Sequence, residues 1–320
     1  MPVKDEAPQR AAARQNEAVS EGWNKANASF FAGAGAGLVN SVLCAPLDLA
    51  KTRIQIQGSL PAFRGKYHGV ISTLRAIYRD EGIRGCYRGL TPALITVPLF
   101  WSVFYTTYNS TKVKYKELLP SETERPWHHI LSAVTAGAAA DLATNPLWVV
   151  RTRMQTLHLH PESPLPENAS MLRVAAHIAR TEGAGAFFKG LAASLLGLTH
   201  VAVQFPIYEW LKKVSRSRND GEEHPVHLVL ASIGAKAAAV GATYPHEVLR
   251  ARMQDRRGRR GSKPLGLVGT FRAIVAAEGW TSLYSGLRVN LVRIIPSTVS
   301  TFLSYELLYK WLASSPSSAY

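Results

Sequence analysis

Charged side chains recur in a proline-containing motif that the chain carries three times. In each copy a position that is acidic in two of the three stands three residues before a basic one, and a glutamine follows four residues later. The copies are Pro46-Leu-Asp48-Leu-Ala-Lys51-Thr-Arg53-Ile-Gln55, Pro146-Leu-Trp148-Val-Val-Arg151-Thr-Arg153-Met-Gln155 and Pro245-His-Glu247-Val-Leu-Arg250-Ala-Arg252-Met-Gln254. Residues three apart on a helix lie on nearly the same face. The motif therefore favours ion pairing over nucleophilic or hydrolytic chemistry.

Three copies arranged around a pseudo-threefold axis predict a ring in which each acid meets the base of the next copy. Two ion pairs are expected, Asp48 with Arg151 and Glu247 with Lys51. Trp148 takes the place of the third acid, and we expect its indole face to hold Arg250 by a cation–π contact. Because exposed pairs are individually weak, such a ring can close one end of a cavity and reopen as a gate. A solvated helix end beside anionic lipid is the alternative.

Three further features of the repeated unit suggest how such a gate would work. Gln55, Gln155 and Gln254 lie one helical turn past the bases and predict amide hydrogen bonds that brace the charge pairs. Pro46, Pro146 and Pro245 predict kinks that make the helices converge. A weaker second gate is expected at the other end, from Lys112, Glu209, Lys212 and Glu306, with Asn109 and Tyr309 replacing an acid and a base. Two gates on one cavity describe alternating access.

The spacing of the motifs divides the chain into three tandem repeats of about one hundred residues. Each repeat has one apolar stretch before its proline and another after an aromatic-basic-glycine element. Each stretch is long enough to cross a membrane as a helix, and a short amphipathic segment lies between the two. We therefore expect an all-α membrane protein with six transmembrane helices and pseudo-threefold symmetry. The expected ranges are 28–118, 127–217 and 225–314 for the repeats, with a disordered tail at 1–27 and a C-terminal tail at 315–320.

The composition excludes several other classes of protein. The net charge of +15 suits nucleic acid as well as anionic lipid or an anionic substrate, but six apolar stretches argue against a soluble nucleic-acid-binding protein. The two cysteines, Cys44 and Cys86, have no metal-like spacing and form no disulfide framework. The chain lacks phosphate-loop, dinucleotide-fingerprint, metalloprotease and nucleophile-elbow motifs. We expect a transporter and not an enzyme, with no metal, no cofactor and no nucleic-acid partner.

With these motifs the chain resembles the mitochondrial carrier family, whose signature is P-x-[DE]-x-x-[KR]-x-[KR] followed by [DE]-G-x-x-x-x-[aromatic]-[KR]-G in three tandem repeats. The second element is found as Glu81-Gly82 with Tyr87-Arg88-Gly89, Glu182-Gly183 with Phe188-Lys189-Gly190, and Glu278-Gly279 with Tyr284-Ser285-Gly286. The resemblance implies a monomer in the mitochondrial inner membrane, with both termini toward the intermembrane space. It places the proline motifs and the short surface helices on the matrix side. It also implies cardiolipin as a structural lipid at Gly82, Gly89, Gly183, Gly190, Gly279 and Gly286.

Several stretches are similar to the branch of that family that carries NAD, pyrimidine nucleotides, folates or flavins. They are Asn145-Pro-Leu-Trp-Val-Val-Arg-Thr-Arg153, Pro245-His-Glu-Val-Leu-Arg-Ala-Arg252, Gly197-Leu-Thr-His-Val-Ala-Val-Gln-Phe-Pro-Ile-Tyr-Glu209 and Asn290-Leu-Val-Arg-Ile-Ile-Pro296. The last, with the fourth-span stretch, is most similar to fungal-type NAD carriers. This implies antiport of NAD+ for a nucleotide such as AMP. The alternatives are a carrier of pyrimidine nucleotides, FAD or folate, and a non-transporting membrane adaptor on a carrier scaffold.

Candidate substrate contacts lie near the middle of the spans. Counting back from the second gate gives the triplet Thr96, Leu196 and Arg293, in which only Arg293 is charged. Its guanidinium fork matches phosphate oxygens, although an ion pair between helices is the alternative. By the resemblance, Leu196 and Gly197 occupy the second substrate contact, where the glycine leaves room for a flat ring.

Four other polar residues complete the predicted substrate site. Lys236 precedes Glu247 by nearly three helical turns, so it faces the same interior and is a second candidate for the pyrophosphate. His200 and Gln204 could bond a base or amide, or a neighbouring helix. Asp141 also faces inward and could pair with Lys236 or Arg293 in the empty state, so that substrate displaces an ion pair.

Overall fold

The computed structural model describes residues 7–118, 126–218, 225–256 and 265–314. These residues form helices and connections, and no strand occurs among them. The chain divides into two compact units, Met1–Leu43 with Pro296–Tyr320, and Cys44–Ile295. The helix α1 (Ala7–Gln57) and the helix α11 (Leu287–Ser314) each have residues in both units.

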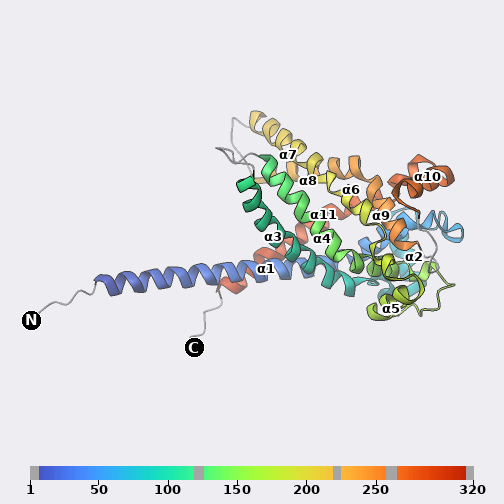
Figure 1. The fold of residues 1–320 in the computed structure, drawn as a ribbon, viewed down its shortest axis with the longest axis horizontal. Coiled ribbons are helices and arrows are strands. Elements are labelled where there is room, and N and C mark those ends of the chain that lie inside the picture. The colour runs from blue at the N-terminus through green and yellow to red at the C-terminus, as the bar shows by residue number, and fades with distance from the viewer. Residues whose placement is uncertain (1–6, 119–125, 219–224, 257–264, 315–320) are drawn as a thin grey trace, which may run out of the picture. The chain divides into compact units, whose positions relative to one another are not determined.

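Each repeat consists of a long helix, a surface helix and a second long helix (Figure 1). The first repeat contains α1, α2 (Val70–Cys86) and α3 (Leu90–Leu118). The second contains α4 (Pro126–Gln155), α5 (Met171–Thr181), α6 (Leu191–Gly197) and α7 (Thr199–Arg218). The third contains α8 (Pro225–Thr243), α9 (Pro245–Asp255), α10 (Leu267–Glu278) and α11. The connections hold the 3-10 helices η1 (Pro61–Phe63), η2 (Leu157–Leu159), η3 (Ala184–Phe188) and η4 (Trp280–Tyr284). The prediction of three all-helical repeats is confirmed.

The long helices differ in how apolar they are. Among the described residues, Phe31–Gln57 and Leu90–Leu118 are long and apolar enough to cross a membrane. The bent pair His227–Thr243 and Pro245–Asp255 makes a third span if the pair is counted as one. The remaining long helices are not set apart by charge alone, because α4 has three charged residues, Phe31–Gln57 also has three and Leu90–Leu118 has four. Six spans are therefore expected from the repeated plan rather than from hydropathy alone.

The three motif prolines act differently on their helices. The helices on either side of Tyr244 are bent by 60°, immediately before Pro245, which lacks the N–H that a continuous helix needs. Pro46 and Pro146 lie inside α1 and α4, and both helices continue through them. A break in the helical chain is therefore present only at the third of these prolines.

The N-terminal region differs from its predicted state. A disordered tail was expected over residues 1–27, but α1 begins at Ala7. The run from Ala11 to Gln15 consists of strong helix formers, and Pro8 lies in the first turn, where proline is tolerated. The expected C-terminal tail at 315–320 lies outside the described residues.

The surface helices attach to the motif helices through equivalent apolar contacts. Each buries two residues one helical turn apart, which are Thr73 and Ile77, Val174 and Ile178, and Thr270 and Ile274. Each isoleucine shares a core cluster with the residue that precedes the first motif base, namely Ala50, Val150 and Leu249. Burying one such isoleucine contributes about 1.5–3 kcal/mol, so these contacts hold the charged ends of the motif helices in place.

Small residues allow close approach of helices within each unit. A Cβ on Gly137 of α4 would lie 2.6 Å from Cδ2 of Leu198, and one on Gly35 of α1 would lie 2.6 Å from Cδ1 of Leu308. Within the second unit, α3 packs against α4 and α7 against α8, so adjacent repeats are joined along long helices (Figure 1).

Candidate functional site

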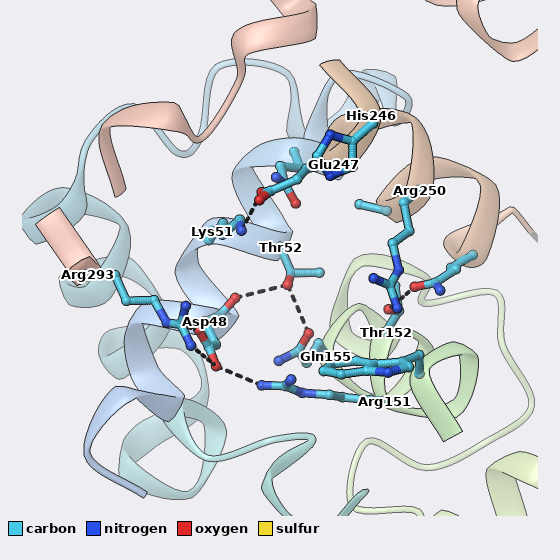
Figure 2. A pocket seen from close by; sticks show the side chains of 14 residues that line it. Asp48, Lys51, Thr52, Arg151, Thr152, Gln155, His246, Glu247, Arg250 and Arg293 are labelled. Atoms are coloured by element: carbon cyan, nitrogen blue, oxygen red, sulfur yellow. Dashed lines mark hydrogen bonds and ion pairs between the residues drawn. The ribbon is translucent and has the colours of Figure 1, made fainter. Parts of the chain in front are cut away.

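The three motifs line one cavity of about 250 Å³ within the second unit (Figure 2). Six motif positions form what we call the inner ring, Asp48, Lys51, Trp148, Arg151, Glu247 and Arg250. Gln55, Gln155, Gln254 and Arg293 also line the cavity. The lining therefore holds four cations against two carboxylates, and it suits an anion.

Both predicted ion pairs of the inner ring are present. An Nη of Arg151 lies 2.8 Å from Oδ2 of Asp48, and Nζ of Lys51 lies 2.5 Å from Oε2 of Glu247 (Figure 2). Asn290 joins the second pair, because its Oδ1 accepts from Lys51 at 3.1 Å and its Nδ2 lies 3.5 Å from Oε1 of Glu247. The charges thus link consecutive repeats, as the threefold arrangement predicts.

Trp148 makes the predicted contact with Arg250 and a second contact that the sequence did not suggest. The guanidinium carbon of Arg250 lies 5.0 Å from the centre of the indole, and that of Arg151 lies 5.1 Å from it. Both distances are within the range of cation–π attraction. One indole therefore holds two arginines from different repeats.

Arg293 is not isolated at mid-span as the substrate prediction assumed. It forms an ion pair with Asp48, and its Nη2 lies 3.5 Å from Oδ2 of that carboxylate (Figure 2). The alternative of an ion pair between helices is therefore present in this state. Lys236 is exposed and near enough to Arg293 for their charges to repel. Both remain predicted substrate contacts, and of the two only Arg293 lines the cavity.

Asp141 has a different partner from the two that were predicted. It is 6% exposed, and its Oδ1 lies 3.9 Å from Nη2 of Arg250. The expected pairing with Lys236 or Arg293 is wrong here. With Trp148 in place of an acid, Asp141, two helical turns earlier on α4, is the carboxylate that lies within 4 Å of Arg250 in the described part of the chain.

The three glutamines line the cavity, but they do not brace the ion pairs directly. Oε1 of Gln155 accepts from Thr52 at 2.9 Å, and Oε1 of Gln254 accepts from Thr152 at 2.9 Å. The third repeat has Ala251 at the threonine position, and Nε2 of Gln55 donates instead to the Tyr244 hydroxyl at 3.0 Å. The predicted bracing of charge pairs is wrong, because a threonine between the two motif bases is nearer to the amide.

A second set of charges, the outer ring, was missed by the sequence analysis. It consists of three buried ion pairs, Arg53 with Glu81, Arg153 with Glu182, and Arg252 with Glu278. Each arginine also donates its Nε to the backbone carbonyl of a motif glutamine in the next repeat, at 2.6–3.1 Å. The recurrence of an arginine and a glutamate in every repeat was a signal that could have revealed it.

Glu182 shows the electrostatics of this ring outside the spans. Its Oε1 accepts from Arg153 at 2.7 Å, and Lys189 forms a second ion pair with it. Burial raises the pKa of Glu182, but hydrogen bonds and charge from Arg153 and Lys189 outweigh burial and hold this pKa below its usual range. The carboxylate is therefore held in its charged form.

The remaining predicted substrate contacts are not gathered around this cavity. Thr96 is fully buried and donates its hydroxyl to the carbonyl of Pro92 at 2.6 Å, and Leu196 is exposed. The space beside Gly197 is filled by His246, because a Cβ there would lie 2.7 Å from its Nε2. The prediction that Gly197 leaves room for a flat ring is therefore wrong in this structure.

The predicted contacts on α7 lie toward a neighbouring helix. Nδ1 of His200 lies 3.3 Å from Oγ1 of Thr243 on α8, which matches the alternative of a helix–helix hydrogen bond. Gln204 is half-buried. Neither residue lines the charged cavity.

The four residues of the predicted second gate lie on α3, α7 and α11. Glu306 bonds to Lys310 one helical turn later, at 2.7 Å, on the same helix. Glu209 is exposed, whereas Lys112 and Lys212 are half-buried. The role of these four residues stays a prediction.

The six glycines predicted to bind lipid form two groups, and all have a positive φ. A Cβ on Gly89, Gly190 or Gly286 would lie 2.8–3.2 Å from Cγ of a motif glutamine in the next repeat. A Cβ on Gly82, Gly183 or Gly279 would have nothing within 4 Å. The first group is therefore needed for repeat packing, and the second for a backbone turn in open space.

Known proteins share this arrangement of repeats. The family model described as mitochondrial carrier protein matches residues 22–118, 122–219 and 221–316. "Nicotinamide adenine dinucleotide transporter 2, mitochondrial" of Arabidopsis thaliana is 37% identical over 289 residues, covering 88% of this chain and 78% of the relative.

Two fungal relatives match a similar share of the chain. "Mitochondrial nicotinamide adenine dinucleotide transporter 1" of Saccharomyces cerevisiae is 38% identical over 283 residues, covering 86% of this chain and 74% of the relative. A mitochondrial pyrimidine nucleotide transporter of the same yeast is 30% identical over 323 residues, covering 89% of this chain and 85% of the relative. Three family matches and relatives of this similarity show that the chain belongs to the mitochondrial carrier protein family and is a transporter rather than an enzyme.

Proposed function

We propose that this protein carries NAD+ across the mitochondrial inner membrane in exchange for a nucleotide such as AMP. Two relatives at 37% and 38% identity are named as NAD transporters, whereas the one named for pyrimidine nucleotides is 30% identical. The order of similarity supports NAD+ as the first candidate substrate.

The observation that carries the proposal is an electropositive cavity closed by two ion pairs between repeats. Its lining has two more cations than carboxylates, which suits the pyrophosphate of a dinucleotide. The pairs of the inner ring are partly exposed, with 12–25% of each side chain accessible, so breaking them costs little. Substrate binding can therefore supply the energy to open this end of the cavity.

Arg293 is the proposed link between substrate and gate. In the empty state it shares Asp48 with Arg151. A phosphate that drew Arg293 away from Asp48 would weaken the charge network at the first repeat. Lys236, exposed and close to Arg293, would bind the second phosphate.

The proposal extends to the membrane setting. A monomer would lie in the inner membrane with both termini toward the intermembrane space and the inner ring toward the matrix. Cardiolipin would bind at the glycine elements, where Gly82, Gly183 and Gly279 leave open space beside the backbone. No other cofactor is proposed.

Exchange in liposomes tests the substrate. The purified protein would be reconstituted, loaded with AMP, and offered labelled NAD+, UTP, FAD or folate. We expect the fastest uptake for NAD+, and uptake should require internal AMP. Faster exchange of UTP, FAD or folate would transfer the assignment to that substrate, and no exchange of any of them would favour the membrane adaptor.

The contribution of Arg293 is tested in the same assay. Arg293→Gln should reduce NAD+ exchange by more than about tenfold, and Arg293→Lys should retain more of it, because the lysine keeps the charge but loses the fork. Extraction in alkaline carbonate shows whether each variant still inserts. Wild-type uptake by inserted Arg293→Gln protein would remove this residue from the site.

A further inference from the structure

The inner ring is incomplete where Trp148 replaces an acid. Trp148 lies about 5 Å from the guanidinium groups of Arg151 and Arg250, so it positions both arginines. An indole attracts cations but carries no net charge, so it does not neutralise them. Asp48 pairs with Arg151 and Glu247 pairs with Lys51, so Arg250 is the base of the inner ring that has no carboxylate at hydrogen-bond distance among the described residues.

Buried donors without acceptors are concentrated beside Trp148. Four buried N–H groups of residues that line the cavity have no hydrogen-bond acceptor among the described residues: Nε1 of Trp148, Nε of Arg151, Nη2 of Arg250 and Nε2 of Gln254. A buried donor left unsatisfied is costly, and native structures keep few of them without a functional reason. Four such donors from adjacent repeats indicate a site for an acceptor-rich group.

Asp141 does not fill this need. Its Oδ1 lies 3.9 Å from Nη2 of Arg250, which is beyond hydrogen-bond distance, and it does not line the cavity. Figure 2 shows Arg250 extending from α9 toward the part of the cavity that Arg151 and Thr152 line. The four buried donors are therefore left without a carboxylate at hydrogen-bond distance.

We propose that Trp148, Arg151, Arg250 and Gln254 form a second phosphate subsite, at the level of the gate itself. A phosphate group supplies both things that this sector lacks, several acceptor oxygens and negative charge, and arginine forks match its geometry. The substrate would then take the place of the missing third acid while it passes. The proposal rests on the proposed function, because the phosphate belongs to the transported nucleotide.

Ligand-induced stabilisation of the purified full-length protein in detergent tests the subsite. The probes are inorganic pyrophosphate, NAD+ and phosphate-free nicotinamide riboside, and the apparent dissociation constant follows from thermal unfolding at increasing ligand concentration. The matched variants are Trp148→Glu and Trp148→Gln, which have side chains of the same size. Only the glutamate supplies the missing charge, and it should occupy the subsite as a built-in acid.

We expect Trp148→Glu to bind pyrophosphate and NAD+ at least about tenfold more weakly than Trp148→Gln, a difference of about 1.4 kcal/mol. Trp148→Phe, which keeps an aromatic face for the arginines but loses the Nε1 donor, should bind both ligands more weakly than the wild type and more tightly than Trp148→Glu. Nicotinamide riboside should not distinguish the glutamate and glutamine variants. The difference should persist when Arg293→Gln is added, because Arg293 belongs to the proposed central contact.

Equal affinities of the glutamate and glutamine variants for pyrophosphate would overturn the subsite. A difference for pyrophosphate but not for NAD+ would overturn its assignment to the substrate and leave an inorganic-anion site. If Trp148→Glu does not fold, the charge is varied at Arg250 instead. Arg250→Lys keeps the positive charge and Arg250→Gln removes it, so Arg250→Gln should bind pyrophosphate and NAD+ more weakly than Arg250→Lys. Liposome exchange is read separately, because wild-type protein that binds pyrophosphate but moves no NAD+ contradicts the proposed function alone.

Discussion

The inner and outer rings lie at the same end of the repeats, yet they differ in burial and in regularity. The outer ring has an arginine and a glutamate in all three repeats, with 0–14% of each side chain exposed. The inner ring pairs are 12–25% exposed, and Trp148 interrupts them. The outer pairs join residues of one repeat, whereas the inner pairs join different repeats.

This difference separates a structural role from a mobile one. Removing one member of a buried pair leaves an uncompensated charge, so all three repeats keep both partners. Partly exposed pairs contribute little individually, so a repeat can replace an acid by an indole and the ring can still open. Variation between repeats is therefore tolerated in the partly exposed inner ring, while the buried arginine–glutamate pairs of the outer ring keep both partners.

The largest expected effect comes from breaking the most buried outer pair. Arg53→Gln leaves Glu81, whose side chain is 0% exposed, with Arg88 at 2.6 Å and His158 at 3.9 Å, and should lower the free energy of unfolding by about 3–5 kcal/mol. Lys66→Gln is the matched control, because its pair with Asp80 is 36% and 31% exposed and should cost no more than about 1 kcal/mol. Thermal unfolding in detergent measures both. Equal losses of unfolding free energy in the two variants would mean that burial does not make the Arg53–Glu81 pair more important than an exposed pair.

The features that could be predicted from the sequence are those that depend only on the spacing of the three repeats. Three copies with an acid three residues before a base were enough to predict the pairs of Asp48 and Glu247. A fixed spacing also placed helices and surface segments, because each repeat must bury the same faces. Trp148 was predicted to hold Arg250 for the same reason.

The predictions that failed depend on how far each helix is rotated. Thr96 and Arg293 occupy equivalent positions in the sequence, yet the first bonds its own helix and the second pairs with Asp48. Which side chain fills a space is likewise not encoded in spacing, as His246 beside Gly197 shows. The outer ring was missed because its partners lie 26–29 residues apart and meet only when the surface helix folds back.

The second prediction concerns the inner ring and uses transport as its readout. Lys51→Glu and Glu247→Lys each place like charges together and should each reduce exchange in liposomes by about tenfold or more. Exchanging both restores an ion pair, and the coupling between the two positions should be about 0.5–3 kcal/mol. Asn290 can form hydrogen bonds with both members of the original pair and of the exchanged pair, because its amide both donates and accepts.

The control for this swap is a double variant that removes both charges without reversing either. The double variant Lys51→Met with Glu247→Met should unfold near the wild-type temperature but leave the cavity end poorly closed. A swapped protein that is no more active than either reversal alone would contradict direct pairing in the transport cycle.

The third prediction uses pH to test the outer ring without deleting a side chain. The pKa of Glu182 is held below the ordinary value of 4.5, so the carboxylate stabilises the fold above that pH. This contribution is lost as the pH falls through the lower pKa of the folded state. The effect should be smaller than that of Arg53→Gln, since a protonated carboxyl still forms hydrogen bonds.

Unfolding temperatures of the wild type and Glu182→Gln, compared between pH 7 and pH 4, measure this contribution. The wild type should lose part of its advantage over Glu182→Gln between pH 7 and pH 4, since that range passes the ordinary pKa of 4.5. Glu117→Gln, at an exposed position on α3, is the control and should leave the pH dependence unchanged. An advantage that grew toward acid would contradict a stabilising ion pair at Glu182.

The smallest expected effect comes from completing a contact that the third repeat lacks. Arg88 bonds Glu81 at 2.6 Å and Lys189 bonds Glu182, but the equivalent position beside Glu278 is Ser285. Ser285→Lys should supply that cation and raise the free energy of unfolding by less than about 1 kcal/mol, because the new pair would be partly solvated. Ser285→Gln, of similar length but uncharged, should give no gain. If the lysine variant is no more stable than the glutamine variant, Arg252 alone already satisfies Glu278, and the outer ring needs only one cation per repeat.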